Sequence, residues 1–224
     1  MRPVLERELV FVTGKGGVGR TTVCAALGLV AASRGKRTIV CELGEAHRLP
    51  RLFGVSSHGE GAGDEVALTE NLWAASMDPQ VAVRDYLATQ LPGPLVRFLS
   101  DSRTFGYLYA AAPGAQEVAT LGGVWDLLHG KLRDRTYDMV IVDAPATGHA
   151  LGLIRAPRTI GEIARVGPVR NRADRIRGLL RDTVRTTYAA VTTLGEIPVT
   201  ETLELSDALA AELERPLELI VANG

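Results

Sequence analysis

A glycine-dense turn at residues 14–19 constrains the fold of this chain more than any other feature. Before it, residues 9–12 form an apolar run typical of a buried strand, and after it residues 21–32 are apolar enough for a buried helix. A strand, a glycine loop and a helix in that order direct backbone N–H groups and a helix N-terminus at a phosphate. The sequence therefore predicts a phosphate-binding loop.

The loop fits the phosphate-loop pattern G-x-x-x-x-G-K-[ST], except that Arg20 stands in the place of the lysine. Arg20 keeps the positive charge, and Lys15 adds a second cation within the loop. The hydroxyl of Thr21 occupies the position that binds Mg²⁺ in such loops. The predicted binding segment comprises Gly14, Lys15, Gly16, Gly17, Val18, Gly19, Arg20, Thr21 and Thr22.

The same residues also match G-x-G-x-x-G, the fingerprint of a dinucleotide-binding fold. Glu42 ends the next apolar run about 20 residues further on, where that fingerprint requires an acid. Two hydroxyls, on Thr21 and Thr22, favour metal–phosphate chemistry instead, and so does the charge of Lys15. An NAD(P)-dependent oxidoreductase remains an alternative, and a glycine turn without any ligand is the third interpretation.

A second candidate magnesium ligand follows the clearest strand after the first, at residues 137–143. Four apolar residues there end in Asp143, and Pro145 is expected to break the strand ladder. A carboxylate at the end of a parallel strand, beside a phosphate loop, suits a magnesium ion. We expect Asp143 and Thr21 to serve the same ion, and residues 146–149 to continue the turn.

The rest of the chain alternates between strand and helix patterns. Strands are expected at 37–42, 71–77, 186–194 and 217–222, and helices at 165–185 and 201–215. A loop is expected at 44–50, a glycine-rich surface excursion at 58–64, and a helical insertion at 80–130 that could bind a partner. The predicted fold is α/β, a mostly parallel, doubly wound sheet in a single domain over residues 1–224, cut short at its C-terminal end.

Composition excludes several function classes. The 224 residues carry a net charge of −1, so no overall attraction to nucleic acid or anionic lipid is expected. No apolar run reaches the ~18 residues of a membrane span, and the N-terminus lacks the apolar core of a signal peptide. Cys24 and Cys41 lack metal-ligand spacing and are expected in the core. A cytoplasmic location is the expectation.

Two segments carry a family resemblance. Residues 14–22 resemble K-G-G-V-G-K-T-T, the deviant phosphate loop of arsenical pump ATPases, tail-anchored-protein targeting ATPases and MinD/ParA proteins. Residues 143–151 resemble the D-x-A-P-T-G-H-x-L switch of the first two groups, so the chain is similar to the ArsA-like, anion-transporting ATPase family. The resemblance implies ATP and Mg²⁺ as cofactors and a dimer in which Lys15 reaches the neighbour's nucleotide. It also implies that Asn223 contacts the adenine.

Two departures from the pattern of that family affect the expected rate of ATP hydrolysis. Where the family has the lysine of the loop, this chain has Arg20, whose planar guanidinium has a different reach. Its D-P-A-H-N motif reads G-E-A-H-R at residues 44–48, so the water-orienting aspartate is replaced by Gly44. Glu42 or Glu45 could serve instead. The arsenite-binding cysteines have no counterpart, and a zinc C-x-x-C pair would fall beyond Gly224.

These features predict an ATPase that binds Mg-ATP at a dimer interface and hydrolyses it slowly. The dimer is expected to join identical chains or a paralogue, and to couple the nucleotide to a client, possible clients including a hydrophobic protein. A non-hydrolysing regulatory subunit of a paralogue heterodimer is the alternative from a different class. Neither nucleic acid nor stable membrane insertion is expected.

Overall fold

The computed structural model describes residues 3–44, 48–55, 65–90, 114–130 and 136–224. Its strands form one sheet in the order β3-β4-β2-β5-β1-β6-β7, in which only the β3–β4 pair is antiparallel. This arrangement confirms the predicted α/β, mostly parallel sheet. The strands are β1 (Leu9–Gly14), β2 (Thr38–Leu43), β3 (Glu65–Thr69), β4 (Leu72–Met77), β5 (Met139–Ala146), β6 (Thr186–Thr192) and β7 (Leu219–Ala222).

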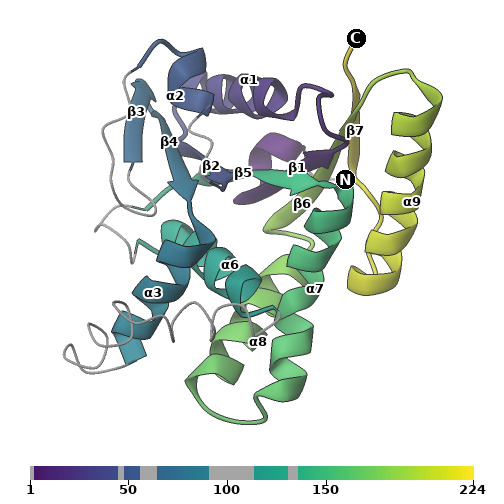
Figure 1. Ribbon diagram of the computed structural model, residues 1–224. Coiled ribbons are helices and arrows are strands. Elements are labelled where there is room, and N and C mark those ends of the chain that lie inside the picture. Colours follow the sequence, from purple (N-terminus) through teal and green to yellow (C-terminus); the bar gives the residue numbers. More distant parts are fainter. Residues whose placement is uncertain (1–2, 45–47, 56–64, 91–113, 131–135) are drawn as a thin grey trace.

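Helices cover both faces of the sheet, which makes three layers (Figure 1). On one face α1 packs on the side chains of Val10 and Val12; on the other, the helices α6 to α9 pack on Leu9 and Phe11. Each side chain of a strand points to the face opposite its neighbours, so β1 supplies both cores. The helices are α1 (Arg20–Ser33), α2 (Arg48–Leu52), α3 (Pro79–Gln90), α6 (Ala115–Leu128), α7 (Thr147–Ile163), α8 (Pro168–Arg181) and α9 (Glu196–Leu213), with a 3₁₀ turn η1 (Val4–Glu6).

The strand order is not that of a dinucleotide-binding fold. In that fold the strand after the glycine loop lies directly beside the first strand, so that its terminal acid reaches the bound ribose. Here β5 separates β2 from β1, and β6 lies on the other side of β1. The end of β2, with Glu42, is therefore two strands away from the loop.

Three elements differ from the sequence expectations. Residues 48–52 form the short helix α2 where a loop is predicted to reach residue 50, and residues 65–69 form the edge strand β3, which was not predicted. The third is the switch-like segment after Asp143. β5 runs through Pro145 to Ala146, and α7 begins at once with Thr147, so residues 146–149 do not form a turn.

Pro145 does not end β5: the strand continues to Ala146, although proline has no N–H to donate to the ladder. The register of β5 on β1 shifts between Val12 and Gly14, and the hydroxyl of Thr13 donates a hydrogen bond to the carbonyl of Pro145 at 3.0 Å. A side chain thus replaces part of the backbone ladder at this point. The irregularity lies where β5 ends beside the glycine loop.

The predicted helical insertion at 80–130 is helical in both described parts, α3 and α6, while residues 91–113 lie outside the described residues. Asp78 caps the N-terminus of α3, because its carboxylate accepts hydrogen bonds from the N–H groups of Gln80 and Val81 at 2.6 and 3.3 Å. Within the described residues, no helix is both long and apolar enough to cross a membrane. Cys24 and Cys41 are fully buried, as predicted.

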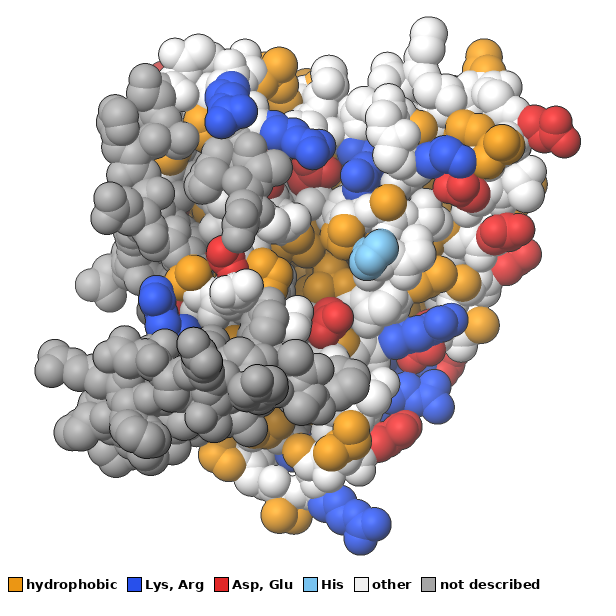
Figure 2. Space-filling model, viewed as in Figure 1, with side chains coloured by type: hydrophobic (Ala, Val, Ile, Leu, Met, Phe, Trp, Pro, Cys, Tyr) orange, Lys and Arg blue, Asp and Glu red, His pale blue; other side chains and the backbone are white. Residues whose placement is uncertain are grey.

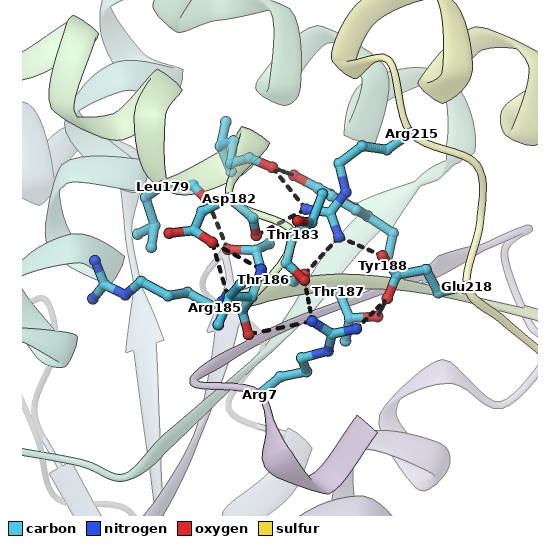
Figure 3. Close-up of polar contacts among 12 residues, drawn as sticks. Arg7, Leu179, Asp182, Thr183, Arg185, Thr186, Thr187, Tyr188, Arg215 and Glu218 are labelled. Carbon is cyan, nitrogen blue, oxygen red and sulfur yellow. Dashed lines mark hydrogen bonds and ion pairs between the residues drawn. The ribbon is translucent and has the colours of Figure 1, made fainter. Parts of the chain in front are cut away.

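A buried polar cluster joins the N-terminal segment to β6 and β7, at the opposite end of the strands from the loop (Figure 3). Glu218 lies between the guanidinium groups of Arg7, at 3.2 Å, and Arg215, and it accepts a hydrogen bond from Thr187 at 2.5 Å. Both arginines are almost fully buried. Burial alone would raise the pKa of Glu218, but these hydrogen bonds and charges outweigh it and lower the pKa.

Candidate functional site

Backbone conformation favours glycine at two positions of the loop, and at Gly14 a side chain would also collide with the backbone of β6. Gly14 ends β1 with φ +150°, and a Cβ atom there would lie 2.1 Å from the carbonyl oxygen of Val191 on β6. Gly19 precedes α1 in the left-handed region, with φ +87°, and its Cβ would lie 2.3 Å from the side-chain nitrogen of Asn223. Strand β6 and Asn223, the residue after β7, therefore pack closely against the loop.

The two predicted magnesium ligands lie in direct contact. Thr21 Oγ1, in the first turn of α1, donates a hydrogen bond of 2.6 Å to Asp143 Oδ2, on β5. Burial raises the pKa of Asp143 above its ordinary value, although the bond from Thr21 and the charges of Arg20 and Arg48 counteract the rise. The desolvated carboxylate is thus held beside a hydroxyl, both of them hard oxygen donors.

Arg20 points across the end of β5. Its Nη1 donates a hydrogen bond to the carbonyl of Ala144, the residue after Asp143. This bond uses one of the five N–H donors of the guanidinium. The side chain therefore lies along the strand that carries Asp143, and its charge stays beside the Thr21–Asp143 pair.

Lys15 is paired within its own chain. Its Nζ lies 2.7 Å from Glu201 Oε1, on α9, and both side chains are about one-third exposed, at 37% and 34%. Around this pair lies a pocket with about 780 Å³ of empty space between the loop, α7 and α9. It is lined by Lys15, Gly16, Ala146, Thr147, Gly148, Leu151, Glu201, Glu204 and Leu205.

Of the two acids predicted to orient water, only Glu42 lies in the described part of the chain, since Glu45 falls outside it. Glu42 is almost fully buried, and its two carboxylate oxygens accept hydrogen bonds from the N–H groups of Arg48 and Leu49 at 3.0 and 3.1 Å. Both bonds fix the start of α2. Glu42 is the register partner of Asp143, so the two carboxylates lie on the same face of the sheet.

Asn223 approaches the loop from the far end of the chain. Its side-chain nitrogen donates a hydrogen bond of 2.9 Å to the carbonyl of Val18, and its backbone N–H donates to Thr192 on β6 at 2.8 Å. The structure thus places Asn223 against the loop. Contact with a nucleotide base stays a prediction.

A polar pocket with about 380 Å³ of empty space lies beside Asp143, at the end of β5. It is lined by Arg20, Glu42, Leu43, Arg48, Asp143, Ala144 and Pro145. Lys and Arg side chains gather on this face of the molecule near α1, α2 and the upper end of α9 (Figure 2). Arg48 is the charged lining residue that sequence reasoning missed as a site residue, and its sequence signal is that it replaces an asparagine of the family's motif.

The donors present fit a magnesium ion that also takes oxygens from phosphate and water. Mg²⁺ is commonly held by one or two protein oxygens, with the remaining ligands from substrate and solvent. Thr21 and Asp143 supply such a pair at 2.6 Å from each other. Within the described residues, no cluster of three or more His, Cys, Asp or Glu side chains forms a complete metal site without other ligands.

The chain is similar to known ATPases over most of its length. The model of the anion-transporting ATPase family matches residues 7–172. The chain is 28% identical to the ATPase BagA of Mycobacterium tuberculosis over 96% of its own length and 64% of that protein. It is 32% identical to the ATPase ASNA1 homolog 1 of Paramecium tetraurelia (70% of this chain, 46% of that protein).

A further relative is the putative arsenical pump-driving ATPase 2 of Aquifex aeolicus, at 28% identity over 69% of this chain and 50% of that protein. The chain thus spans about half to two-thirds of the length of these relatives. The family match covers the loop, the Thr21–Asp143 pair and the switch-like start of α7. From the fold, the loop and this match together, we conclude that the chain belongs to the anion-transporting ATPase (ArsA) family.

Proposed function

We propose that this protein binds Mg-ATP at the end of β1 and hydrolyses it slowly as one half of a dimer. The observation that carries the proposal is the contact between Thr21 and Asp143, which joins the first turn of α1 to the end of β5 at 2.6 Å. A glycine loop alone can have other uses. A loop followed by a hydroxyl that is paired with a desolvated carboxylate suits a metal–triphosphate.

Each part of the site has a role in this proposal. The backbone N–H groups of residues 14–19 surround the phosphates, and Thr21 and Asp143 hold the magnesium ion. Bound there, Mg²⁺ would supply a Lewis acid that neutralises charge on the phosphate oxygens. Arg20 and Lys15 stabilise the charge that develops when water attacks the terminal phosphorus atom in line with the leaving oxygen.

Slow turnover follows from the residues that face the attacking water. Gly44 replaces the aspartate expected there and has no side chain that could orient water. Both oxygens of Glu42 are engaged by the start of α2, which leaves this carboxylate poorly suited to the task. Water-positioning groups affect such reactions strongly, so we expect turnover well below the enzyme median of about 10 per second.

The dimer and the client belong to the same proposal. In a dimer Lys15 would leave Glu201 and contact the nucleotide of the neighbouring subunit, a second copy of this chain or a paralogue. The nucleotide state would then be coupled to a client, for which a hydrophobic protein is one candidate. The relatives carry the names of ATPases and of an arsenical pump-driving ATPase, which supports nucleotide use in general.

Ligand binding tests the proposal directly. We expect Mg-ATP and Mg-ADP to raise the midpoint of thermal unfolding, and NAD to leave it unchanged. Thr21→Ala should reduce the shift by ATP, chelation of magnesium should reduce it in wild type, and Ser33→Ala, at the other end of α1, serves as the hydroxyl control. A shift with NAD alone would contradict the proposal in favour of an oxidoreductase.

Measuring hydrolysis distinguishes an active ATPase from the remaining alternative, a non-hydrolysing regulatory subunit. Release of phosphate by the purified protein, lost in Thr21→Ala, supports an active ATPase. Binding without any release, with turnover restored only by a paralogous ATPase, supports instead a regulatory subunit. The strand order argues against the oxidoreductase, because β5 lies between β2 and β1.

A further inference from the structure

Arg48 begins α2 at a fixed position beside the proposed phosphate site. Its backbone N–H donates to Glu42 Oε1 at 3.0 Å, and the N–H of the next residue, Leu49, donates to Glu42 Oε2 at 3.1 Å. Leu49 is fully buried, whereas Arg48 is exposed. The backbone is therefore anchored on both sides of the Arg48 Cα, while its long side chain stays accessible from solvent.

The side chain of Arg48 lines the same pocket as Arg20, Glu42 and Asp143. The strand order explains this meeting. The loop follows β1, Asp143 lies at the end of β5, and Arg48 follows β2. These groups therefore come from the C-terminal ends of three strands that lie side by side in the middle of the sheet. Helix α2 also lies beside α1, which begins with Arg20 (Figure 1).

The other charged groups around this pocket already have partners. Asp143 accepts the hydrogen bond from Thr21, Glu42 accepts two backbone N–H groups, and Arg20 donates to the carbonyl of Ala144. Across the described ranges, no ion pair or side-chain hydrogen bond engages the guanidinium of Arg48. Its charge does act on Asp143, whose pKa is raised by burial and lowered in part by Arg48.

We propose that Arg48 binds the terminal phosphate of the bound nucleoside triphosphate, as a second guanidinium beside Arg20. This assignment rests on the proposed function and adds a residue to it. The phosphates start in the loop after β1, and the chain of phosphates that extends over β5 toward β2 meets Arg48 at its far end. A guanidinium donates two parallel N–H bonds to a phosphate, which makes arginine suited to that position.

The assignment predicts discrimination between ATP and ADP. A residue that contacts only the terminal phosphate contributes to binding of the triphosphate and little to binding of the diphosphate. Arg20 shares its donors between the carbonyl of Ala144 and the nucleotide, so a second cation has more effect here than in a loop with a free lysine. Arg48 would thereby offset part of the affinity for phosphate that the loop loses by having Arg20 in place of a lysine.

Binding of Mg-ATP and Mg-ADP to Arg48→Gln tests this, with Arg51→Gln as the matched control. Arg51 lies on the same short helix, is exposed, and does not line the pocket. Titration calorimetry on wild type and both variants gives the dissociation constants, and the unfolding midpoint shows that each variant is folded. We expect Arg48→Gln to weaken Mg-ATP at least tenfold and Mg-ADP less than twofold, and Arg51→Gln to change neither more than twofold.

Arg48→Lys should recover part of the lost ATP affinity, because it restores the charge but not the paired donors. Equal losses for ATP and ADP in Arg48→Gln would overturn the assignment to the terminal phosphate. Equal effects of Arg48→Gln and Arg51→Gln would overturn it too, since they would indicate only a general effect of positive charge. Wild-type protein that binds neither nucleotide would contradict the proposed function itself, and this assignment with it.

Discussion

Lys15 and Glu201 form an ion pair of 2.7 Å that joins the phosphate loop to α9 of the same chain. In the proposed dimer we expect the ammonium group to leave this carboxylate for a phosphate of the neighbouring subunit. Because both side chains are about one-third exposed, the pair contributes at most about 1 kcal/mol, so it biases the position of Lys15 without locking it.

Glu201→Gln should increase the affinity for Mg-ATP. Without its carboxylate partner, the Lys15 ammonium is free to contact a phosphate, and a contribution of about 1 kcal/mol corresponds to an increase of up to about fivefold. The increase should shrink at high salt, which screens exposed charges. Titration of wild type and variant with Mg-ATP at low and high salt measures both effects.

Glu204→Gln is the control for this prediction, because Glu204 lines the same pocket without pairing with Lys15. It should alter affinity less than twofold. In a Lys15→Ala background the effect of Glu201→Gln should disappear, since the two residues act through one contact. An undiminished effect in that background would show that Glu201 acts on the nucleotide by another route.

Arg20→Lys should raise the rate of ATP hydrolysis at least about tenfold, which is about 1.4 kcal/mol in the barrier. A lysine restores a compact charge on the loop and no longer shares it with the carbonyl of Ala144 through a planar fork. Phosphate release under saturating ATP measures the change. Arg34→Lys, just past the other end of α1, is the conservative control and should leave the rate as in wild type; an equal rate for Arg20→Lys would mean that Arg20 does not limit turnover.

Asp143→Asn should abolish the magnesium dependence of ATP binding and yet raise the unfolding midpoint of the nucleotide-free protein at neutral pH. Burial raises the pKa of Asp143, so its stabilising contribution exists below its ordinary value of 3.8 and is lost as pH rises through the folded-state pKa. At neutral pH the buried, ionised carboxylate is therefore destabilising. Asparagine removes that charge and keeps an acceptor for Thr21.

Asp138→Asn, just before the start of β5, provides the opposite case. Hydrogen bonds from Arg37 lower the pKa of Asp138, so its ionised form stabilises the folded protein above the ordinary value of 3.8. That substitution should lower the midpoint slightly, since the pair with Arg37 is exposed. A lower midpoint for both variants would contradict the effect of burial assigned to Asp143.

Glu218→Gln should destabilise the protein by about 3 kcal/mol, because it removes the carboxylate that pairs with two buried guanidinium groups. The pKa of Glu218 is lowered, so its contribution is present above the ordinary value of 4.5 and is lost as pH falls through the folded-state pKa. Denaturant unfolding of wild type and variant at neutral pH and below pH 4.5 measures this contribution. The difference in unfolding free energy between the two proteins should shrink in acid.

Glu214→Gln is the matched control, since Glu214 pairs with Arg181 while 80% of its side chain is exposed. It should change the unfolding free energy by less than about 0.5 kcal/mol. Similar losses for Glu214→Gln and Glu218→Gln would show that burial of the cluster in Figure 3 does not determine its effect.

The sheet and the positions of Thr21 and Asp143 at the ends of their elements were accessible to sequence reasoning, because apolar runs and their terminal polar residues follow simple rules. Helix α7 was missed although its buried residues Ala150, Leu153, Ile154 and Pro157 recur at helical spacing. Residues 146–149 were expected to continue a turn, yet α7 begins at Thr147 and runs on through Pro157, which is buried within the helix. Strand β3 was missed because it is a short, half-exposed edge strand.

The directions of the charged side chains were not predictable. Local pattern places Lys15 and Arg20 in the loop, but their partners, Glu201 and the carbonyl of Ala144, come from elements more than 100 residues away. Arg48 likewise enters the site only through the order of β1, β5 and β2 in the sheet. Such meetings depend on long-range topology, which one sequence read locally does not contain.

The position of β1 has a consequence for how the loop can move. All six residues of β1 are buried, and parallel strands flank it on both sides. We therefore expect its backbone amides to exchange with deuterium only through opening of the sheet, and the loop that leaves its end is attached to this protected strand. A nucleotide bound to this loop therefore stabilises the protein against global unfolding by its full binding free energy, and not only against a local fluctuation.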